Sequence, residues 1–175
     1  MEAYQRDLST AGSRFVPQDF LQSLFVSELL FPSKTLWLIS PWLSDIAIID
    51  NTARQFSSLN PDWSATSIRL SSILGVLVER GTRMVIIVNQ DSHNDEFLIR
   101  MRPFQIRFPK QLFVIREADL HEKGLLGDTF TLDGSMNFTF NGVYVNEEHL
   151  IYRCDPAKVA ERRLTLLDRW GDRLC

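Results

Sequence analysis

Three short runs of apolar residues constrain the fold more than any other feature of this sequence. They occupy residues 36–39, 84–88 and 112–115, and each has about the length of a β-strand. Because no polar residue alternates within them, each is expected to be buried on both faces, as in the centre of a parallel sheet. Apolar residues at helical spacing precede the first two runs, over 19–30 and 68–79. This order of helix, strand, helix and strand predicts an α/β fold.

The last third of the chain indicates more strands and a closing helix. Residues 125–132 and 149–153 are strand-like in composition. A helix is expected over 156–170, with proline in its first turn. The sequence shows no internal repeat. We therefore predict one α/β domain over 17–175, a mixed sheet flanked by helices.

Four features indicate where regular structure stops. Residues 1–16 are expected to form a loose N-terminal arm, and residues 50–66 a polar loop. Gly81 suits the C-terminus of the helix before it. Pro103 is expected to end the amphipathic segment that covers 91–101.

Composition limits the possible functions. A chain of 175 residues can form one substantial core, and its net charge of −3 gives no overall attraction to phosphate. Two cysteines make no disulfide framework. The first residues lack the apolar stretch of a secretory signal, and no later run approaches membrane-spanning length. We therefore expect a soluble, cytoplasmic protein without membrane insertion.

A short polar pattern begins at His121. The sequence reads His-Glu-Lys from there, and Gly-Ser-Met-Asn from position 134. On a strand, residues two apart point to the same side, so His121 and Lys123 would project together. A histidine can attack phosphorus or donate a proton, and an ammonium can neutralise phosphate oxygens. Ser135 and Asn137, again two apart, could add hydrogen-bond donors to the same phosphate.

This pattern resembles the signature of the phospholipase D superfamily. The matching positions are His121, Lys123, Asp128, Gly134, Ser135 and Asn137. Asn146 and Glu148 resemble the family's downstream Asn-x-Glu element, in which the carboxylate orients the histidine. The segment that ends in Ser-Pro-Trp at Trp42 resembles an early strand and turn of these domains. One departure is the spacing from Asp128 to Gly134, which has five intervening residues instead of six. A residue lost from a strand would reverse the side chains that follow.

The resemblance implies a phosphodiesterase that works through a phosphohistidine, with no metal and no cofactor. Family members need two such motifs, and this chain has one. Short members place two copies at an isologous dimer interface, so a homodimer is expected in which each subunit contributes His121, Lys123 and Asn137. Small single-motif members resemble nucleases, and some accompany bacterial DNA-modification and restriction clusters. DNA is thus the expected substrate, with a defence role and partner proteins from such a cluster as further expectations.

Other polar residues have two interpretations each. Residues 100–116 form a basic stretch without acids, so Arg100, Arg102, Arg107 and Lys110 are candidate DNA contacts or a solvated face. Trp42 could line the mouth of the site. Asp128 is expected to be a structural acceptor. The remaining polar residues are expected to be structural or surface groups: His93, His149, Arg162, Arg163 and Arg169.

Two other functions stay open. A phospholipase or phosphatidyl-transferring enzyme would use the same chemistry, but such enzymes usually carry two motifs in a longer chain. A weakly active or inactive binding subunit of a DNA-processing system is the third class, which the shortened spacing after Asp128 leaves open.

Overall fold

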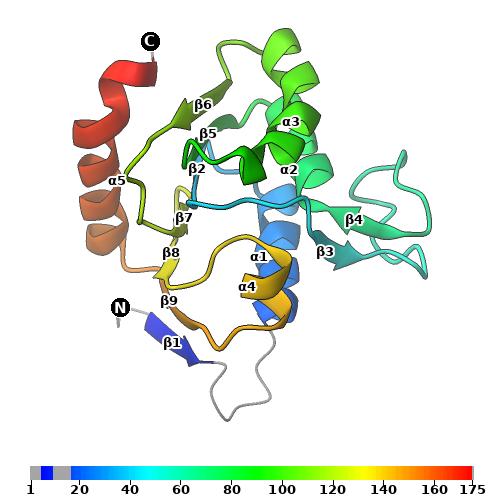
Figure 1. The fold of residues 1–175 in the computed structure, drawn as a ribbon. Helices are drawn as coiled ribbons and strands as arrows, with labels where there is room; N and C mark the ends of the chain where they lie inside the picture. Colours follow the sequence, from blue (N-terminus) through cyan, green and yellow to red (C-terminus); the bar gives the residue numbers. More distant parts are fainter. Residues whose placement is uncertain (1–4, 10–16, 175) are drawn as a thin grey trace.

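The protein is described by a computed structural model that covers residues 5–9 and 17–174. Its centre is a seven-stranded mixed sheet with the order β1-β9-β8-β7-β2-β5-β6 (Figure 1). A separate pair of strands, β3 and β4, lies beside it. The predicted fold class, a mixed α/β sheet flanked by helices, is confirmed.

The parallel half of the sheet comes from the three apolar runs. They form β2 (Thr35–Ile39), β5 (Arg83–Val88) and β6 (Leu112–Arg116), and β5 pairs in parallel with the other two. Successive side chains enter opposite cores: Leu36 and Leu38 lie in one, Trp37 and Ile39 in the other. The prediction of strands buried on both faces is therefore confirmed.

A helix precedes each of these strands in the chain. α1 (Pro17–Leu30) and α2 (Leu70–Glu79) lie where the periodicity predicted helices. Gly81 follows α2 with a φ of +100°, a conformation that glycine adopts without a Cβ penalty. The third of these helices is α3 (Asp95–Arg107). It continues through Pro103, which was expected to end it. Packing of the buried Phe97 and Met101 holds this helix despite the proline, whose cost is about 3 kcal/mol in a helix interior.

The antiparallel half contains the sequence motif. β7 (Gly124–Leu126) pairs with β2 and, through a tight turn, with β8 (Thr131–Gly134), so residues 125–132 are a hairpin and not one strand. β9 (His149–Arg153) pairs with β8. Part of the expected N-terminal arm is β1 (Gln5–Ser9), which pairs with β9 at the sheet edge (Figure 1). The rest of the arm lies outside the described residues.

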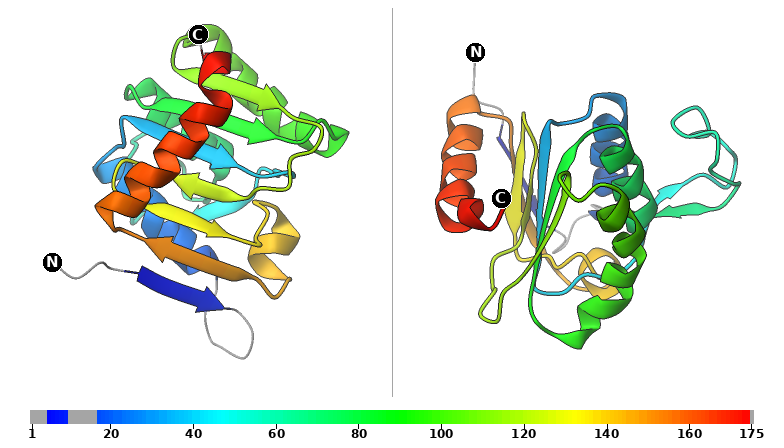
Figure 2. Two further views of the ribbon diagram at one scale, coloured as in Figure 1. Left: turned by 90° about the vertical axis from the view of Figure 1, so that its left-hand side faces the viewer. Right: turned by 90° about the horizontal axis from the view of Figure 1, so that it is seen from above.

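Helices cover both faces of the sheet. α5 (Pro156–Trp170) crosses one face alone, and α1, α2 and α3 cover the other (Figure 2). Two hydrophobic cores fill the two interfaces, and Trp170 anchors α5 in the smaller one. A short 3-10 turn (Gly171–Leu174) follows α5.

Two elements had no sequence prediction. The polar segment 50–66 connects β3 (Ala47–Asp50) to β4 (Ser67–Arg69), and the hairpin projects from the body of the molecule (Figure 2). The second element is α4 (Phe140–Tyr144), a helix of five residues that follows the motif. Within the described part of the chain, no helix is long and apolar enough to cross a membrane.

Candidate active site

His121 and Lys123 lie just before β7, on a segment that continues its extended path. The His121 side chain is exposed, and the structure shows no side-chain partner for it among the described residues. The Lys123 ammonium donates to the backbone carbonyl of His121 at 2.9 Å. No carboxylate within the described ranges forms an ion pair with Lys123. Its charge is therefore available for an external anion.

Glu122, between these two residues, points toward α5. Its carboxylate pairs with Arg162 at 2.5 Å and with Arg169 at 3.0 Å, and only about a fifth of its side chain is exposed. Because neighbouring side chains of an extended segment point to opposite sides, fixing Glu122 against α5 also fixes the direction of His121 and Lys123. Arg162 and Arg169 were expected to be surface charges. In the structure their ion pairs with Glu122 hold the motif segment against α5.

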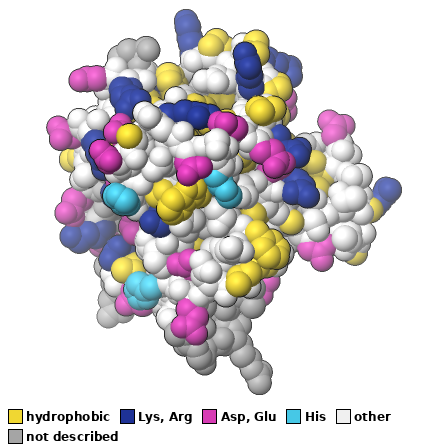
Figure 3. Space-filling view, in the orientation of Figure 1, with side chains coloured by type: hydrophobic (Ala, Val, Ile, Leu, Met, Phe, Trp, Pro, Cys, Tyr) yellow, Lys and Arg dark blue, Asp and Glu magenta, His cyan; other side chains and the backbone are white. Residues whose placement is uncertain are grey.

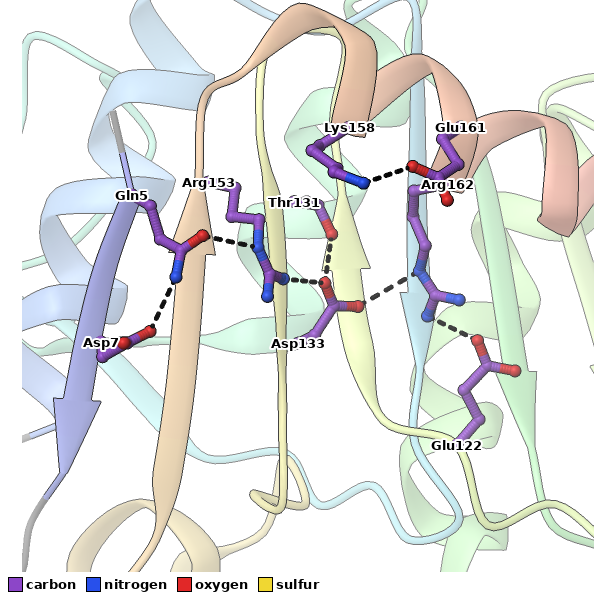
Figure 4. Close-up of polar contacts among 9 residues, drawn as sticks. All are labelled: Gln5, Asp7, Glu122, Thr131, Asp133, Arg153, Lys158, Glu161 and Arg162. Atoms are coloured by element: carbon purple, nitrogen blue, oxygen red, sulfur yellow. Dashed lines mark hydrogen bonds and ion pairs between the residues drawn. The ribbon is translucent and has the colours of Figure 1, made fainter. Parts of the chain in front are cut away.

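The anchor is part of a larger network on the α5 side of the sheet (Figure 4). Arg162 also pairs with Asp133 of β8 at 3.2 Å, and Asp133 pairs with Arg153 of β9 at 3.4 Å. Thr131 donates to the same carboxylate at 2.8 Å. The network couples α5 to the strands on which the motif lies.

Gly134 is the last residue of β8 and pairs with β9, and Ser135 follows it beside the start of β9. Gly134 has a φ of +154°, and a Cβ there would collide with the carbonyl oxygen of His149. Its glycine is therefore required by both the backbone conformation and the close approach of β9. Ser135 donates its hydroxyl to the buried carboxylate of Glu148 and accepts from the backbone N–H of His149 at 3.1 Å. Glu148 also accepts from Asn146 at 3.3 Å.

Asn137 is held by the end of β2. Ser40, which is fully buried, directs its hydroxyl to the Asn137 side-chain oxygen at 3.4 Å and to the Trp42 carbonyl at 2.7 Å. The same hydroxyl accepts from the backbone N–H of Phe138 at 3.2 Å. Leu43 and Phe138 form a parallel bridge beside it. One buried serine thus connects the Ser-Pro-Trp segment to the Gly-Ser-Met-Asn segment.

The interval from Asp128 to Gly134 covers the end of a turn and the strand β8. Residues 127–130 connect β7 to β8, and the turn closes with a hydrogen bond from the Gly127 N–H to the Phe130 carbonyl at 3.0 Å. The pairs Leu125–Leu132 and Gly124–Asp133 are in regular register. Lys123 and Gly134 line the same small crevice. The strand pairing next to the motif is therefore uninterrupted.

Asp128 has a structural environment. Its carboxylate accepts from the backbone N–H of Lys34 at 2.8 Å and pairs with Arg163 at 3.4 Å, and its N–H donates to Ser33 at 2.9 Å. These contacts lie at the end of β7 opposite to His121. Asp128 thus fixes the hairpin to the start of β2.

The basic stretch is not gathered at this site. Arg100 pairs with Asp45 at 3.3 Å, and Arg107 with Glu79 at 3.2 Å, so both charges are offset. Arg107 and Lys110 lie near the start of β6. This strand is the outermost one on the β5 side of the sheet, whereas the motif lies on β7 and β8. Arg102 is exposed midway along α3. Arg100 is held at Asp45, in the segment between β2 and β3.

A hollow of about 450 Å³ opens next to Asn137. Trp42 and His93 contribute to its wall, together with residues of α4. His93 contacts Ser44 at 3.0 Å. The backbone N–H of His93 and the Trp42 indole N–H both donate to Asp91, and these bonds hold the pKa of the Asp91 carboxyl below its ordinary value. Trp42, expected at the mouth of the site, lines this hollow together with Asn137, and so does His93, which was expected to be structural.

The face that carries the motif has a distinctive composition. Figure 3 shows histidine side chains on this side of the molecule, with a patch of hydrophobic side chains beside them. In the part of the chain that the structure describes, no three His, Cys, Asp or Glu side chains are grouped so that they could hold a metal ion. The chemical groups of the residues described above are imidazole, ammonium, hydroxyl, amide and carboxylate.

Comparisons with known proteins identify the fold. No protein-family model matches the sequence, and no curated protein matches it. Solved structures do match over nearly the whole chain, and they show that the chain has the phospholipase D fold. NucT from Helicobacter pylori shares 13% identity with a TM-score of 0.61, over 99% of this chain and 96% of that one.

Two further structures have the same core. Nuc from Salmonella typhimurium, described as a phospholipase D family member, shares 14% identity with a TM-score of 0.61, over 98% of this chain and 94% of that one. A phosphatidylserine synthase from Haemophilus influenzae matches at 16% identity and a TM-score of 0.55, over 98% of this chain but 38% of its own. At such identities the likeness establishes the fold alone.

Proposed function

We propose that this protein is a metal-independent phosphodiesterase that cleaves DNA through a phosphohistidine at His121. One observation supports the proposal: in a phospholipase D fold, Lys123 lines one small crevice with Gly134, the residue before Ser135. Ser135 binds Glu148, Asn137 is held by Ser40, and Lys123 has no carboxylate partner within the described residues. An unpaired ammonium beside an exposed imidazole suits a phosphodiester.

The proposed reaction has two steps. The His121 imidazole attacks phosphorus, so a P–N bond forms while the bond to the leaving oxygen breaks. The partner subunit's His121 gives its proton to that oxygen. Water then attacks the phosphohistidine, loses a proton to the same partner histidine, and releases His121. Lys123 and Asn137 stabilise the phosphate oxygens in both steps.

A second subunit is part of this proposal because the chain has one His-x-Lys motif. His121 is exposed, and the large apolar side chain of Val145 is 63% exposed. An isologous dimer would bring two copies of His121 together across a two-fold axis. Mixing wild-type protein with His121→Ala tests this. Activity that falls as the square of the wild-type fraction supports a shared site, whereas a linear fall contradicts it.

DNA is proposed as the substrate because small single-motif proteins of the resembling family include nucleases. TrmBL2, an archaeal chromatin protein described as having a novel mode of DNA binding, also shares the fold at a TM-score of 0.52 and 14% identity, over 98% of this chain and 53% of its own. The match to a phosphatidylserine synthase favours a second candidate, phosphatidyl transfer or phospholipid hydrolysis. A role in a bacterial DNA-modification or restriction system, with partner proteins, stays a prediction.

The test is DNA cleavage in EDTA. Wild-type protein is expected to cleave single- or double-stranded DNA after treatment with the chelator, and His121→Ala is expected to be inactive. His149→Ala is the matched control, because this exposed histidine contributes only backbone groups to the contacts with Ser135. Turnover of phosphatidylglycerol without cleavage of DNA would support the lipid candidate. Cleavage that needs a divalent metal, or survives in His121→Ala, would refute the mechanism.

A further inference from the structure

The hollow beside Asn137 differs chemically from the phosphate site. Its volume is about 450 Å³, within the roughly 300–1,000 Å³ typical of small-molecule pockets. Two exposed aromatic rings, Trp42 at 41% and Phe140 at 61%, belong to its lining. They come from different parts of the chain, the turn after β2 and the start of α4. Burying either ring would require a ligand with an apolar surface.

Amide groups make up half of the polar lining, and Ser44, Thr139 and His93 supply the rest. Asn137, Asn141 and Asn146 all contribute to it. The Asn141 side chain has no hydrogen-bond partner among residues 5–9 and 17–174. No Asp, Glu, Lys or Arg side chain lines the hollow. Uncharged groups that both donate and accept are suited to a ligand with mixed donors and acceptors and no charge of its own.

We infer that this pocket binds one unpaired nucleobase of the substrate, next to the phosphate that is cleaved. A nucleobase combines the required features, since its flat faces stack on aromatic rings and its edge carries donors and acceptors. A phosphate would find no lysine or arginine in this lining, and an acyl chain would leave the Asn141 amide unpaired. The inference rests on the proposed function, because it names the form of nucleic acid that the site accepts.

Asn137 connects the pocket to the chemistry. It is a motif residue held by Ser40, and it also lines the hollow. A base in the pocket would therefore belong to a nucleotide directly beside the scissile phosphate. In a duplex, the faces of each base are covered by its stacked neighbours. A pocket that contacts those faces therefore selects single strands, or ends and loops where a base can leave the stack.

The experiment compares two short single strands, one with natural bases and one in which abasic spacers flank the cleaved phosphate. For Trp42→Ala and Phe140→Ala we expect KM on the natural strand to rise about tenfold, the loss of one stacking contact. KM on the abasic strand should change less than about twofold. Phe31→Ala is the matched control, because Phe31 is 80% exposed and lines a different hollow. Sedimentation of each variant reports whether its oligomeric state has changed.

Binding is measured separately, by fluorescence anisotropy of the same labelled strands on His121→Ala with and without Phe140→Ala. A preference for the natural over the abasic strand that Phe140→Ala removes supports the base pocket, even if no nucleic acid is cleaved and the proposed function fails. The inference is overturned if Trp42→Ala and Phe140→Ala raise KM equally on both strands, whether or not the Phe140→Ala dimer dissociates. Equal binding of both strands to His121→Ala also overturns it. Wild-type protein that cleaves duplex DNA faster than the single strand also overturns it.

Discussion

The hydroxyl of Ser40 makes a specific prediction about how the site is held together. Ser40→Ala removes a fully buried group that contacts Asn137, Trp42 and the backbone N–H of Phe138. The Phe138 N–H would be left buried without a partner, at a cost of about 1–3 kcal/mol. For a chain of this size each kcal/mol corresponds to about 2–4 °C. The melting temperature should therefore fall by roughly 2 to 12 °C.

A matched substitution separates this effect from the loss of any buried hydroxyl. The Ser57 oxygen is also buried, but it has no hydrogen-bond partner in the described ranges. Ser57→Ala should therefore change the melting temperature little or raise it, because the hydroxyl there is desolvated without compensation. Thermal unfolding by circular dichroism compares the two variants, and DNA cleavage should fall only in Ser40→Ala. Equal melting temperatures for both variants, with full activity, would refute the role of Ser40.

Three more predictions follow from the site and its surroundings. Gly134→Ala should cost about 1–3 kcal/mol because of its positive φ, whereas Gly171→Ala, with open space around its Cβ, should be close to neutral in the same urea titration. Glu122→Gln should lower kcat about 3- to 10-fold with little change in KM, because the ion pair to Arg162 that directs the motif is weakened, and steady-state kinetics measures the split. Burial raises the pKa of Glu28 above its ordinary value of 4.5. The wild type should therefore lose stability relative to Glu28→Gln as pH rises from about 4 to 7, and a constant difference in melting temperature would contradict this.

The main elements could be predicted because their signals are local. α5 begins and ends at the predicted residues, since Asp155 caps it, Pro156 opens it and apolar residues recur at helical spacing. The apolar runs of β2, β5 and β6 were equally clear. β1 was not, because only Leu8 of its five residues is buried and it is defined by pairing with β9. Pro103 misled the prediction for α3, because the packing of its buried face outweighs a local rule.

The candidate site also contains residues that have a local sequence signal and residues that do not. His121, Lys123, Ser135 and Asn137 could be found from their spacing in one short segment. Ser40 could not be assigned its role, because its partner Asn137 is 97 positions away. The contacts of Glu122 could not be predicted either. The arginines with which it pairs belong to α5, and they lie close to it only in the folded chain. Sequence reasoning thus proposes the reacting groups but could not find the residues that contact them from elsewhere in the chain.

The most direct test of the central claim is to trap the intermediate. Wild-type protein is mixed with a DNA substrate, quenched in base within milliseconds, digested, and searched by mass spectrometry for a peptide that carries the phosphoryl group. Our account predicts a base-stable, acid-labile adduct on His121, formed in EDTA and absent from His121→Ala. Continued DNA cleavage with no adduct on His121 at any quench time would contradict it.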